Sequence, residues 1–142
     1  MQPDPVLIIE AAYAARRSGD HDALRRLHHE DVVFTFNADP DKIGSGQRIV
    51  GLDQILAHIE RVETHWDVLE YVAEPILGSG MVYSRFIRVK MYHPETRRVL
   101  EGNKRHVITV IDGRIAAFEE TLDRNLVQAL QRFQRPDESS AA

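Results

Sequence analysis

The 142-residue sequence has no cysteine, so neither a disulfide framework nor a thiolate metal site can form. It also has no apolar run close to the roughly 20 residues that a membrane-spanning helix requires. Its first residues lack the basic stretch that begins a secretory signal. We therefore expect a cytoplasmic protein that makes no contact with a membrane and folds as one domain.

Basic residues are not in excess, because the net charge is −4, and this argues against nucleic acid as a partner. The charge is nevertheless unevenly placed. Between Arg85 and Arg105, seven Lys or Arg stand against two acidic residues. Such a stretch is typical of a solvated strand face whose charges protect the edges of a sheet. It also fits a cationic rim that attracts a weakly acidic ligand.

Seven histidines raise the question of a metal site. No two of them have the i, i+4 spacing of a helical zinc pair, and no cysteine is present to complete a set of ligands. We therefore predict no metal and no cofactor. His58 differs from the other histidines, because it follows Ile55 by three residues and lies on the inward face of a predicted helix. It is either a core residue or a contact for a ligand.

Helical spacing of apolar residues begins at Pro5 in "PVLIIEAAYAARR", and Gly19 is a suitable end for this helix. A second short helix is predicted in "HDALRRLHHE", and a strand follows in "VVFTF". A third helix begins at Leu52 in "LDQILAHIERVETH". The segment 37–51 before it resembles a loop, either a flap over a pocket or a simple connection.

After Trp66 the pattern becomes that of strands. Four runs, "WDVLEYVAEPIL", "MVYSRFIRVKMY", "RRVLEGNKRHVITVI" and "RIAAFEETLD", are separated by turn signals, and "NLVQALQRF" closes the chain as a helix. This order predicts an α+β fold in which three N-terminal helices lie on one face of a curved antiparallel sheet. A hollow between the sheet and the helices is a suitable place for a ligand.

The stretch "HVITVIDGRIAAFEETLD" predicts a hairpin that turns at Asp112 and Gly113. A two-residue turn would place His106 on the same face as Glu119. A three-residue turn with a glycine bulge would place His106 on the same face as Glu120, because a shift of one residue turns every side chain to the other face. We favour the three-residue turn, since it buries the larger apolar residues of the last strand, Phe118 and Leu122.

In this register Glu120 lies among apolar neighbours, with His106 and Lys104 as its nearest polar partners. Burial disfavours the charged form of a carboxylate unless a cation or a hydrogen-bond donor compensates, and such groups are common at catalytic sites. Two interpretations remain open at this point. In the first, the pair is a catalytic acid–base site. In the second, Glu120 only forms a structural pair with His106 or Lys104 at the edge of the sheet.

The phrases "SGDHDALRRLHHEDVVFTF", "IVGLDQILAHI" and "VITVIDGRIAAFEETLD", taken in order, resemble the SnoaL-like branch of the nuclear-transport-factor-two-like superfamily. The resemblance covers about residues 6 to 130. It implies a cone-shaped α+β fold with a deep hydrophobic pocket and a homodimer formed through the sheet. Members of this superfamily include polyketide cyclases, ketosteroid isomerase and limonene epoxide hydrolase, so the fold alone does not define a function.

The pattern of ketosteroid isomerase is only partly present. Its first-helix tyrosine, which donates to the oxyanion, corresponds to Ala12, with Tyr13 one step away. Its general-base aspartate corresponds to Phe36, and its second oxyanion donor corresponds to His106. Without the base, the resemblance does not imply steroid isomerisation by that mechanism.

The pattern of the epoxide hydrolase is also incomplete. Its last-strand aspartate corresponds to Glu120, which keeps the carboxylate, while the arginine and aspartate of its middle strand correspond to Phe86 and Arg88. The tyrosine and asparagine that help to hold its water correspond to Phe34 and Phe36. A water between two phenylalanines would lose those hydrogen bonds.

From these observations we expect residues 1–134 to form a SnoaL-like domain, followed by a disordered tail at 135–142. The domain binds a small, largely apolar or weakly acidic molecule and transfers a proton without a cofactor, as an isomerase, cyclase, dehydratase or hydrolase. His106 is the expected acid or base, Glu120 either orients it or acts as a second carboxylate, and Arg88 steadies negative charge. The sequence leaves open whether Arg85 or Arg88 faces the pocket. The expected substrate-binding residues are Phe34, Phe36, His58, Phe86, Phe118 and Leu122. The alternative is a non-catalytic binding or dimerisation module of the same fold.

Overall fold

The computed structural model describes residues 3–37 and 46–134, so the core of the segment predicted as a flap and the predicted tail at 135–142 lie outside the described residues. The helices are α1 (Pro5–Ser18), α2 (His21–Leu27), α3 (Leu52–Glu63) and α4 (Arg124–Gln134). The strands are β1 (His28–Asn37), β2 (Gln47–Val50), β3 (Asp67–Ala73), β4 (Leu77–Ser79), β5 (Val82–His93), β6 (Arg98–Ile111) and β7 (Arg114–Leu122). Within this part of the chain, no helix is both long and apolar enough to cross a membrane.

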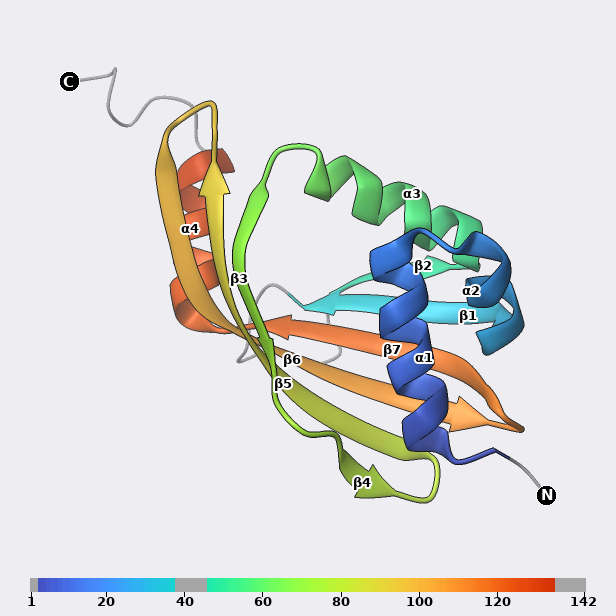
Figure 1. Ribbon diagram of the computed structural model, residues 1–142. Helices are drawn as coiled ribbons and strands as arrows, with labels where there is room; N and C mark the ends of the chain where they lie inside the picture. Colours follow the sequence, from blue (N-terminus) through green and yellow to red (C-terminus); the bar gives the residue numbers. More distant parts are fainter. Residues whose placement is uncertain (1–2, 38–45, 135–142) are drawn as a thin grey trace.

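The strands form one curved sheet in the order β2-β1-β7-β6-β5-β3, and β4 pairs separately with β5 (Figure 1). Neighbouring strands are antiparallel except β1 and β7, which are parallel. The predicted α+β architecture is therefore confirmed. The interpretation of 37–51 as loop was wrong at its end, because β2 pairs with β1 there. The first of the four predicted runs is divided between β3 and β4.

The first two helices, α1 and α2, each begin with a side-chain cap. The carboxylate of Asp4 accepts a hydrogen bond from the Val6 amide, and that of Asp20 accepts one from the Ala23 amide at 3.1 Å. Gly19 ends α1 in the left-handed conformation, with a φ of 71° that strains other residues. The second helix ends earlier than predicted, because the chain becomes extended at His28 and begins β1.

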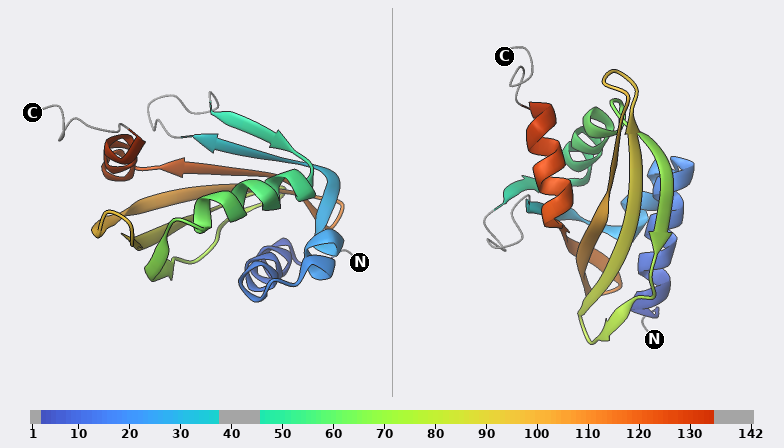
Figure 2. Two further views of the ribbon diagram at one scale, coloured as in Figure 1. Left: turned by 90° about the horizontal axis from the view of Figure 1, so that it is seen from above. Right: turned by 90° about the vertical axis from the view of Figure 1, so that its left-hand side faces the viewer.

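Helices α1, α2 and α3 lie on the same side of the sheet, as the view from above in Figure 2 shows. The core lies between these helices and the inner face of the sheet. Its central side chains include Ile9 of α1, Ile87 of β5, Ile108 of β6 and Ile115 of β7, each no more than 1% exposed. Burial of each such side chain stabilises the fold by about 1.5–3 kcal/mol, so this layer fixes α1 against the strands.

Helix α4 packs against β6 at Gly102, a residue that has no side chain. A Cβ atom built on Gly102 would lie 2.5 Å from Leu126 Cγ, and Leu126 is completely buried. The carboxylate of Asp123 accepts hydrogen bonds from the Leu126 amide at 2.9 Å and the Asn103 amide at 2.7 Å. The helix start and the strand are therefore joined through one carboxylate beside a required glycine.

The β6–β7 hairpin combines features of both predicted registers. Ile111 pairs with Arg114, and Asp112 and Gly113 have φ angles of 50° and 77°, so the turn has two residues and the predicted three-residue turn was wrong. The pairing then shifts by one residue, because Ala116 has no partner in the ladder. Beyond this bulge the inward face is the one that we favoured.

Candidate active site

Three polar side chains form a row across the inner face of the sheet. His106 of β6 is the Cα partner of Arg85 on β5 and of Glu120 on β7. His106 is 1% exposed, Arg85 7% and Glu120 9%. Burial of polar groups at this level costs free energy unless each group finds a partner. The contacts of these three residues therefore define what the row can do.

The His106 imidazole is hydrogen-bonded at both ring nitrogens. Its Nδ1 lies 2.5 Å from the hydroxyl oxygen of Tyr13 on α1, and its Nε2 lies 3.1 Å from Glu120 Oε2. The other carboxylate oxygen of Glu120 lies 3.5 Å from Lys104 Nζ. We call Tyr13, His106 and Glu120 the polar relay. It joins the first helix to the last two long strands.

The charge of Glu120 fixes the positions of the relay protons. Burial alone would raise its pKa, but the Lys104 ammonium and the hydrogen bond from His106 outweigh burial and hold the pKa well below its usual range. An ionised carboxylate only accepts hydrogen bonds, so His106 Nε2 carries the proton. In the neutral imidazole, Nδ1 then accepts from the Tyr13 hydroxyl.

The other two members of the relay both favour their neutral forms. Burial is the main cause that raises the pKa of Tyr13, and the nearby Tyr71 adds to it. Burial also lowers the pKa of His106, although the hydrogen bond and charge of Glu120 act in the opposite direction. The resting relay is therefore a neutral phenol, a neutral imidazole and a carboxylate.

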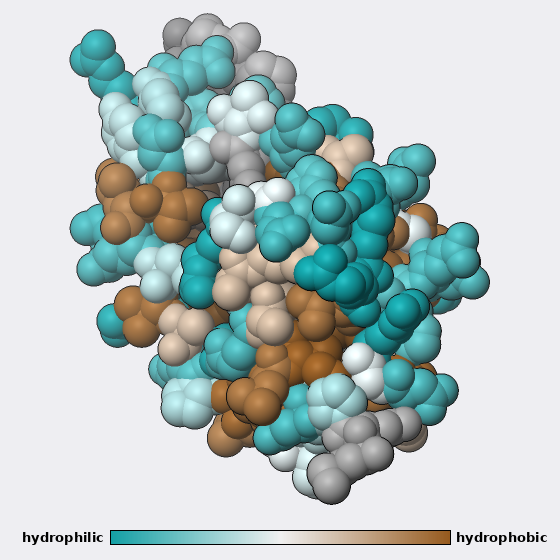
Figure 3. All heavy atoms as spheres, turned by 45° about the vertical axis from the view of Figure 1, so that its right-hand side comes forward, coloured by the Kyte–Doolittle hydropathy of each residue, from teal (hydrophilic) through white to brown (hydrophobic). Residues whose placement is uncertain are grey.

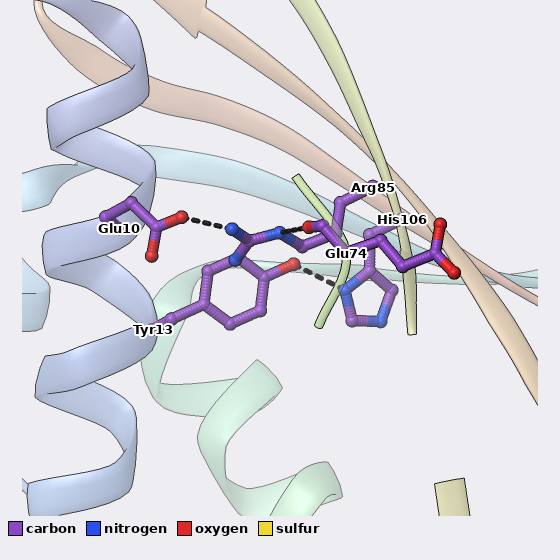
Figure 4. Close-up of polar contacts among 5 residues, drawn as sticks. All are labelled: Glu10, Tyr13, Glu74, Arg85 and His106. Atoms are coloured by element: carbon purple, nitrogen blue, oxygen red, sulfur yellow. Dashed lines mark hydrogen bonds and ion pairs between the residues drawn. The ribbon is translucent and has the colours of Figure 1, made fainter. Parts of the chain in front are cut away.

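Arg85 holds a cation over the face of the Tyr13 ring, with its guanidinium carbon 5.0 Å from the ring centroid. Figure 4 shows the guanidinium between Glu10 and Glu74, with the Tyr13 hydroxyl directed at His106. Arg85 forms an ion pair with Glu10 and donates from Nε to the Glu74 carbonyl at 2.7 Å. These contacts fix both the cation and the orientation of the tyrosine.

An apolar hollow lies between the sheet and the three N-terminal helices. The space that a water-sized sphere can occupy in it is about 60 Å³, and the total is about 590 Å³ when the space open to solvent at its mouth is counted. Figure 3 shows apolar side chains gathered on one face and bordered by polar ones. The described lining residues are Ile9, Ala12, Tyr13, Arg16, Leu24, His28, Val32, Phe34, Leu52, Ile55, Leu56, Ile59, Ile108, Ile115 and Phe118. The relay therefore meets the hollow at Tyr13.

The predicted aromatic residues of β1 and β7 lie on this inner side. Phe34 and Phe118 line the hollow and stack on each other, with ring centroids 5.6 Å apart. The Phe118 ring also lies 4.6 Å from the His106 ring. His58 of α3 lies 6.2 Å from the Phe34 ring and 6.3 Å from the Phe36 ring, so it borders this aromatic group. Leu122 is buried on the same face of the sheet, beside Lys104.

Two predicted site residues lie on the other face of the sheet. The side chains of β5 alternate, and the buried positions are Tyr83, Arg85, Ile87 and Val89. Arg88 and Phe86 therefore point away from the hollow; Arg88 is exposed and Phe86 is 46% exposed. Placing these two residues at the pocket was wrong, because both lie on the outer face, and the buried arginine of this strand is Arg85.

Tyr13 is the site residue that sequence reasoning missed, whereas Arg85 was the open alternative to Arg88. Tyr13 follows Ile9 by four residues and precedes Arg16 by three, so helical spacing places it on the inward face of α1. This was the available signal, but the family pattern directed attention to Ala12. Within the described residues, no group of three or more His, Asp or Glu side chains is arranged to hold a metal ion.

Comparison with known proteins agrees with this architecture. The family model of the SnoaL-like domain matches residues 9–118. No curated protein matches the sequence. A solved NTF2-like protein from Burkholderia thailandensis has a TM-score of 0.76 and 21% identity, over 95% of this chain and all of that chain. IdmH from Streptomyces antibioticus, a proposed polyketide cyclase, has a TM-score of 0.71 and 22% identity, over 92% of this chain and 99% of that chain.

A third solved structure, TerC crystallised with polyporic acid, has a TM-score of 0.71 and 20% identity and covers 89% of this chain and 97% of that one. At these identities the structural likenesses show the fold alone. The family model, however, covers most of the chain. The protein therefore belongs to the SnoaL-like family, within the NTF2-like fold.

Proposed function

We propose that the protein binds a small, largely apolar molecule in the hollow and moves a proton on it without a cofactor, in an isomerisation, cyclisation, dehydration or hydration. One observation carries the proposal. Tyr13 lines an apolar hollow, and its hydroxyl is hydrogen-bonded to a buried imidazole, which is itself bonded to an ionised carboxylate. Membership of a family that includes cyclases and isomerases supports it.

In this proposal His106 has a different role from the one that the sequence suggested. Both ring nitrogens already have partners and the ring is 1% exposed, so Tyr13 is the group that meets the ligand. In the proposed step, the Tyr13 oxygen accepts a proton from a C–H bond of the ligand while its own proton passes to His106 Nδ1. The ligand keeps the electron pair as an enolate, and no tyrosinate forms.

Glu120 and Arg85 assist this step from fixed positions. The imidazolium that forms is stabilised by the carboxylate of Glu120 against its Nε2–H, the logic by which an acidic residue supports the histidine of a hydrolase triad. Arg85 supplies the positive charge that we had assigned to Arg88, since it is buried over the Tyr13 ring. Return of the proton to a different atom of the enolate completes an isomerisation.

The rival function is a binding module in which the relay only fastens α1 to the sheet. A specific observation favours it. Among the described residues, every fully buried side-chain nitrogen and oxygen has a hydrogen-bond partner, as a purely structural network requires. The two functions differ in one measurable respect, because a structural network binds a ligand without accelerating exchange of the ligand's protons.

The test is exchange of α-protons of bicyclic ketones such as 2-tetralone in deuterated water, followed by proton NMR. We expect the wild type to accelerate exchange and Tyr13→Phe and His106→Gln to lose it by about 10²–10⁴-fold. The matched control is Tyr83→Phe, which also removes a hydroxyl from a buried tyrosine; the Tyr83 hydroxyl donates to Gly80. Saturable thermal stabilisation of the wild type by these ketones without exchange would favour the binding module.

A further inference from the structure

We propose that the ligand carries a hydroxyl group, which donates a hydrogen bond to Nε2 of His28 at the wall of the hollow. The ligand is thus a phenol, an enol or an alcohol on a largely apolar body. This inference rests on the binding part of the proposed function and adds the polar group that the ligand must bring. It depends on the position of His28, on the state of its two ring nitrogens and on the composition of the wall.

His28 is the first residue of β1 and lines the hollow. Its Cα partner on β7 is Ile115, and it follows Leu24 of α2 by four residues. Both of these neighbours also line the hollow. The imidazole therefore lies in an apolar part of the wall, where a hydrogen bond is electrostatically stronger than it is in water.

One ring nitrogen of His28 is already bonded. Its Nδ1 lies 2.7 Å from the carbonyl oxygen of Leu24, and a carbonyl oxygen only accepts, so Nδ1 carries the ring proton. Burial lowers the pKa of His28, although the hydrogen bond to Leu24 opposes this effect, so the ring is neutral at about pH 7. In a neutral imidazole the other nitrogen has no proton. Nε2 is therefore a hydrogen-bond acceptor.

This acceptor is accessible to a small molecule. Among the residues that the structure describes, none forms a hydrogen bond with His28 Nε2, whereas every fully buried side-chain nitrogen and oxygen there has a partner. Nε2 is therefore not fully buried. Since His28 is half-buried and lines the hollow, a ligand in the hollow can reach this nitrogen.

The other polar side chains of the wall are less suited to accept a hydrogen bond from the ligand. Among the described lining residues, these are Tyr13 and Arg16. The Tyr13 hydroxyl donates to His106 and belongs to the relay. A guanidinium has no acceptor, and Arg16 has an interaction of its own. His28 is therefore the neutral acceptor of this wall, and it favours a ligand that donates over one that only accepts, such as an ether.

The experiment compares the binding of 2-naphthol and of 2-methoxynaphthalene by fluorescence titration at about pH 7, where a phenol keeps its proton. The two probes share one apolar ring system, and only naphthol can donate. The wild type should bind naphthol about three- to tenfold more tightly, as expected for a neutral hydrogen bond. His28→Asn should lose this preference, because the shorter amide can keep the bond to Leu24 but does not extend to the position of Nε2.

The matched control is the neighbouring histidine. His29 Nε2 lies 2.6 Å from the Ile111 carbonyl oxygen, and His29 is not among the described residues that line the hollow. His29→Gln can keep this bond through its own amide, so it should retain the preference for naphthol. Tyr13→Phe should retain it as well, because the hydroxyl of the ligand is bound by His28.

Nitrogen NMR of the wild type gives a readout that does not depend on a variant. The resonance of the unprotonated Nε2 of His28 should move upfield when naphthol binds, because the nitrogen then accepts a proton donor. Methoxynaphthalene should not cause this shift. An Nε2 resonance that naphthol leaves unchanged would overturn the inference.

Equal affinities in the wild type, a preference that survives in His28→Asn, or one that is lost only in Tyr13→Phe would also overturn it. Urea unfolding of the variants separates lost binding from lost folding. The two proposals fail in different ways. Exchange of ketone protons without any preference for naphthol would refute only the role of His28, whereas that preference without exchange of any substrate would refute only the proton transfer.

Discussion

Acidification should weaken the fold through the buried imidazole of His106. Burial lowers the pKa of His106 in the folded protein, although Glu120 opposes this effect, whereas the same side chain in the unfolded chain titrates near its ordinary value of about 6.5. The unfolded state therefore binds a proton first as the pH falls. The stability is fully present above the unfolded pKa and is lost as the pH falls from there towards the folded pKa.

The size of the effect follows from proton linkage. A histidine that is protonated only in the unfolded state reduces the free energy of unfolding by at most about 1.4 kcal/mol for each pH unit. Burial lowers the pKa of His28 as well, so two histidines act together. Between about pH 7.5 and 5.5 they remove up to about 3 kcal/mol, a large part of the 5–15 kcal/mol that is usual for a domain.

The assay is urea unfolding at about pH 7.5 and about pH 5.5. This range stays above the titration of Glu120 in the unfolded chain, whose contribution is lost only at lower pH because its folded pKa is depressed. His106→Gln should show a smaller difference between the two pH values than the wild type does. His21→Gln, at an exposed position of α2, should match the wild type. An equal difference in His106→Gln and the wild type would refute the reasoning.

Two further predictions concern packing and assembly. Gly102→Ala should reduce the free energy of unfolding by about 1–3 kcal/mol in urea titrations, because its methyl group would overlap Leu126 of α4; an unchanged value would contradict the close approach. The homodimer expected through the sheet should use the exposed apolar side chains of the outer face, among them Val72 and Phe86. Light scattering should show a dimer for the wild type and for Leu7→Arg and a monomer for Phe86→Arg, and a monomeric wild type would contradict this.

Most of the fold was predictable because long elements have a clear period. Apolar spacing defined α1 and α3, and the β-branched runs after Trp66 defined the long strands. The short strand β2 has four residues with little alternation in burial, so its pairing with β1 depends on contacts far along the chain. A local pattern does not contain that information.

The site was predictable only where the two faces of an element differ. In β7 the larger apolar residues favour one face, and this placed Glu120 opposite His106. In β5 both faces carry apolar and basic residues, so alternation alone did not distinguish Arg85 from Arg88. On α1 an error of one position corresponds to about 100° of rotation, which separates Ala12 from Tyr13. The contact between the Tyr13 hydroxyl and His106 depends on how α1 packs on the sheet, which the sequence pattern does not give.

The bulge at Ala116 shifts the pairing register of β7 by one residue. A chain that lacked Ala116 would have a regular ladder and would still place Glu120 opposite His106, because the bulge contributes the one residue without a partner. A chain that lacked Glu119 would instead turn Glu120 outwards and bring Thr121 to the inner face. Two deletions only three positions apart would thus have opposite consequences, one silent and one removing the carboxylate from the relay.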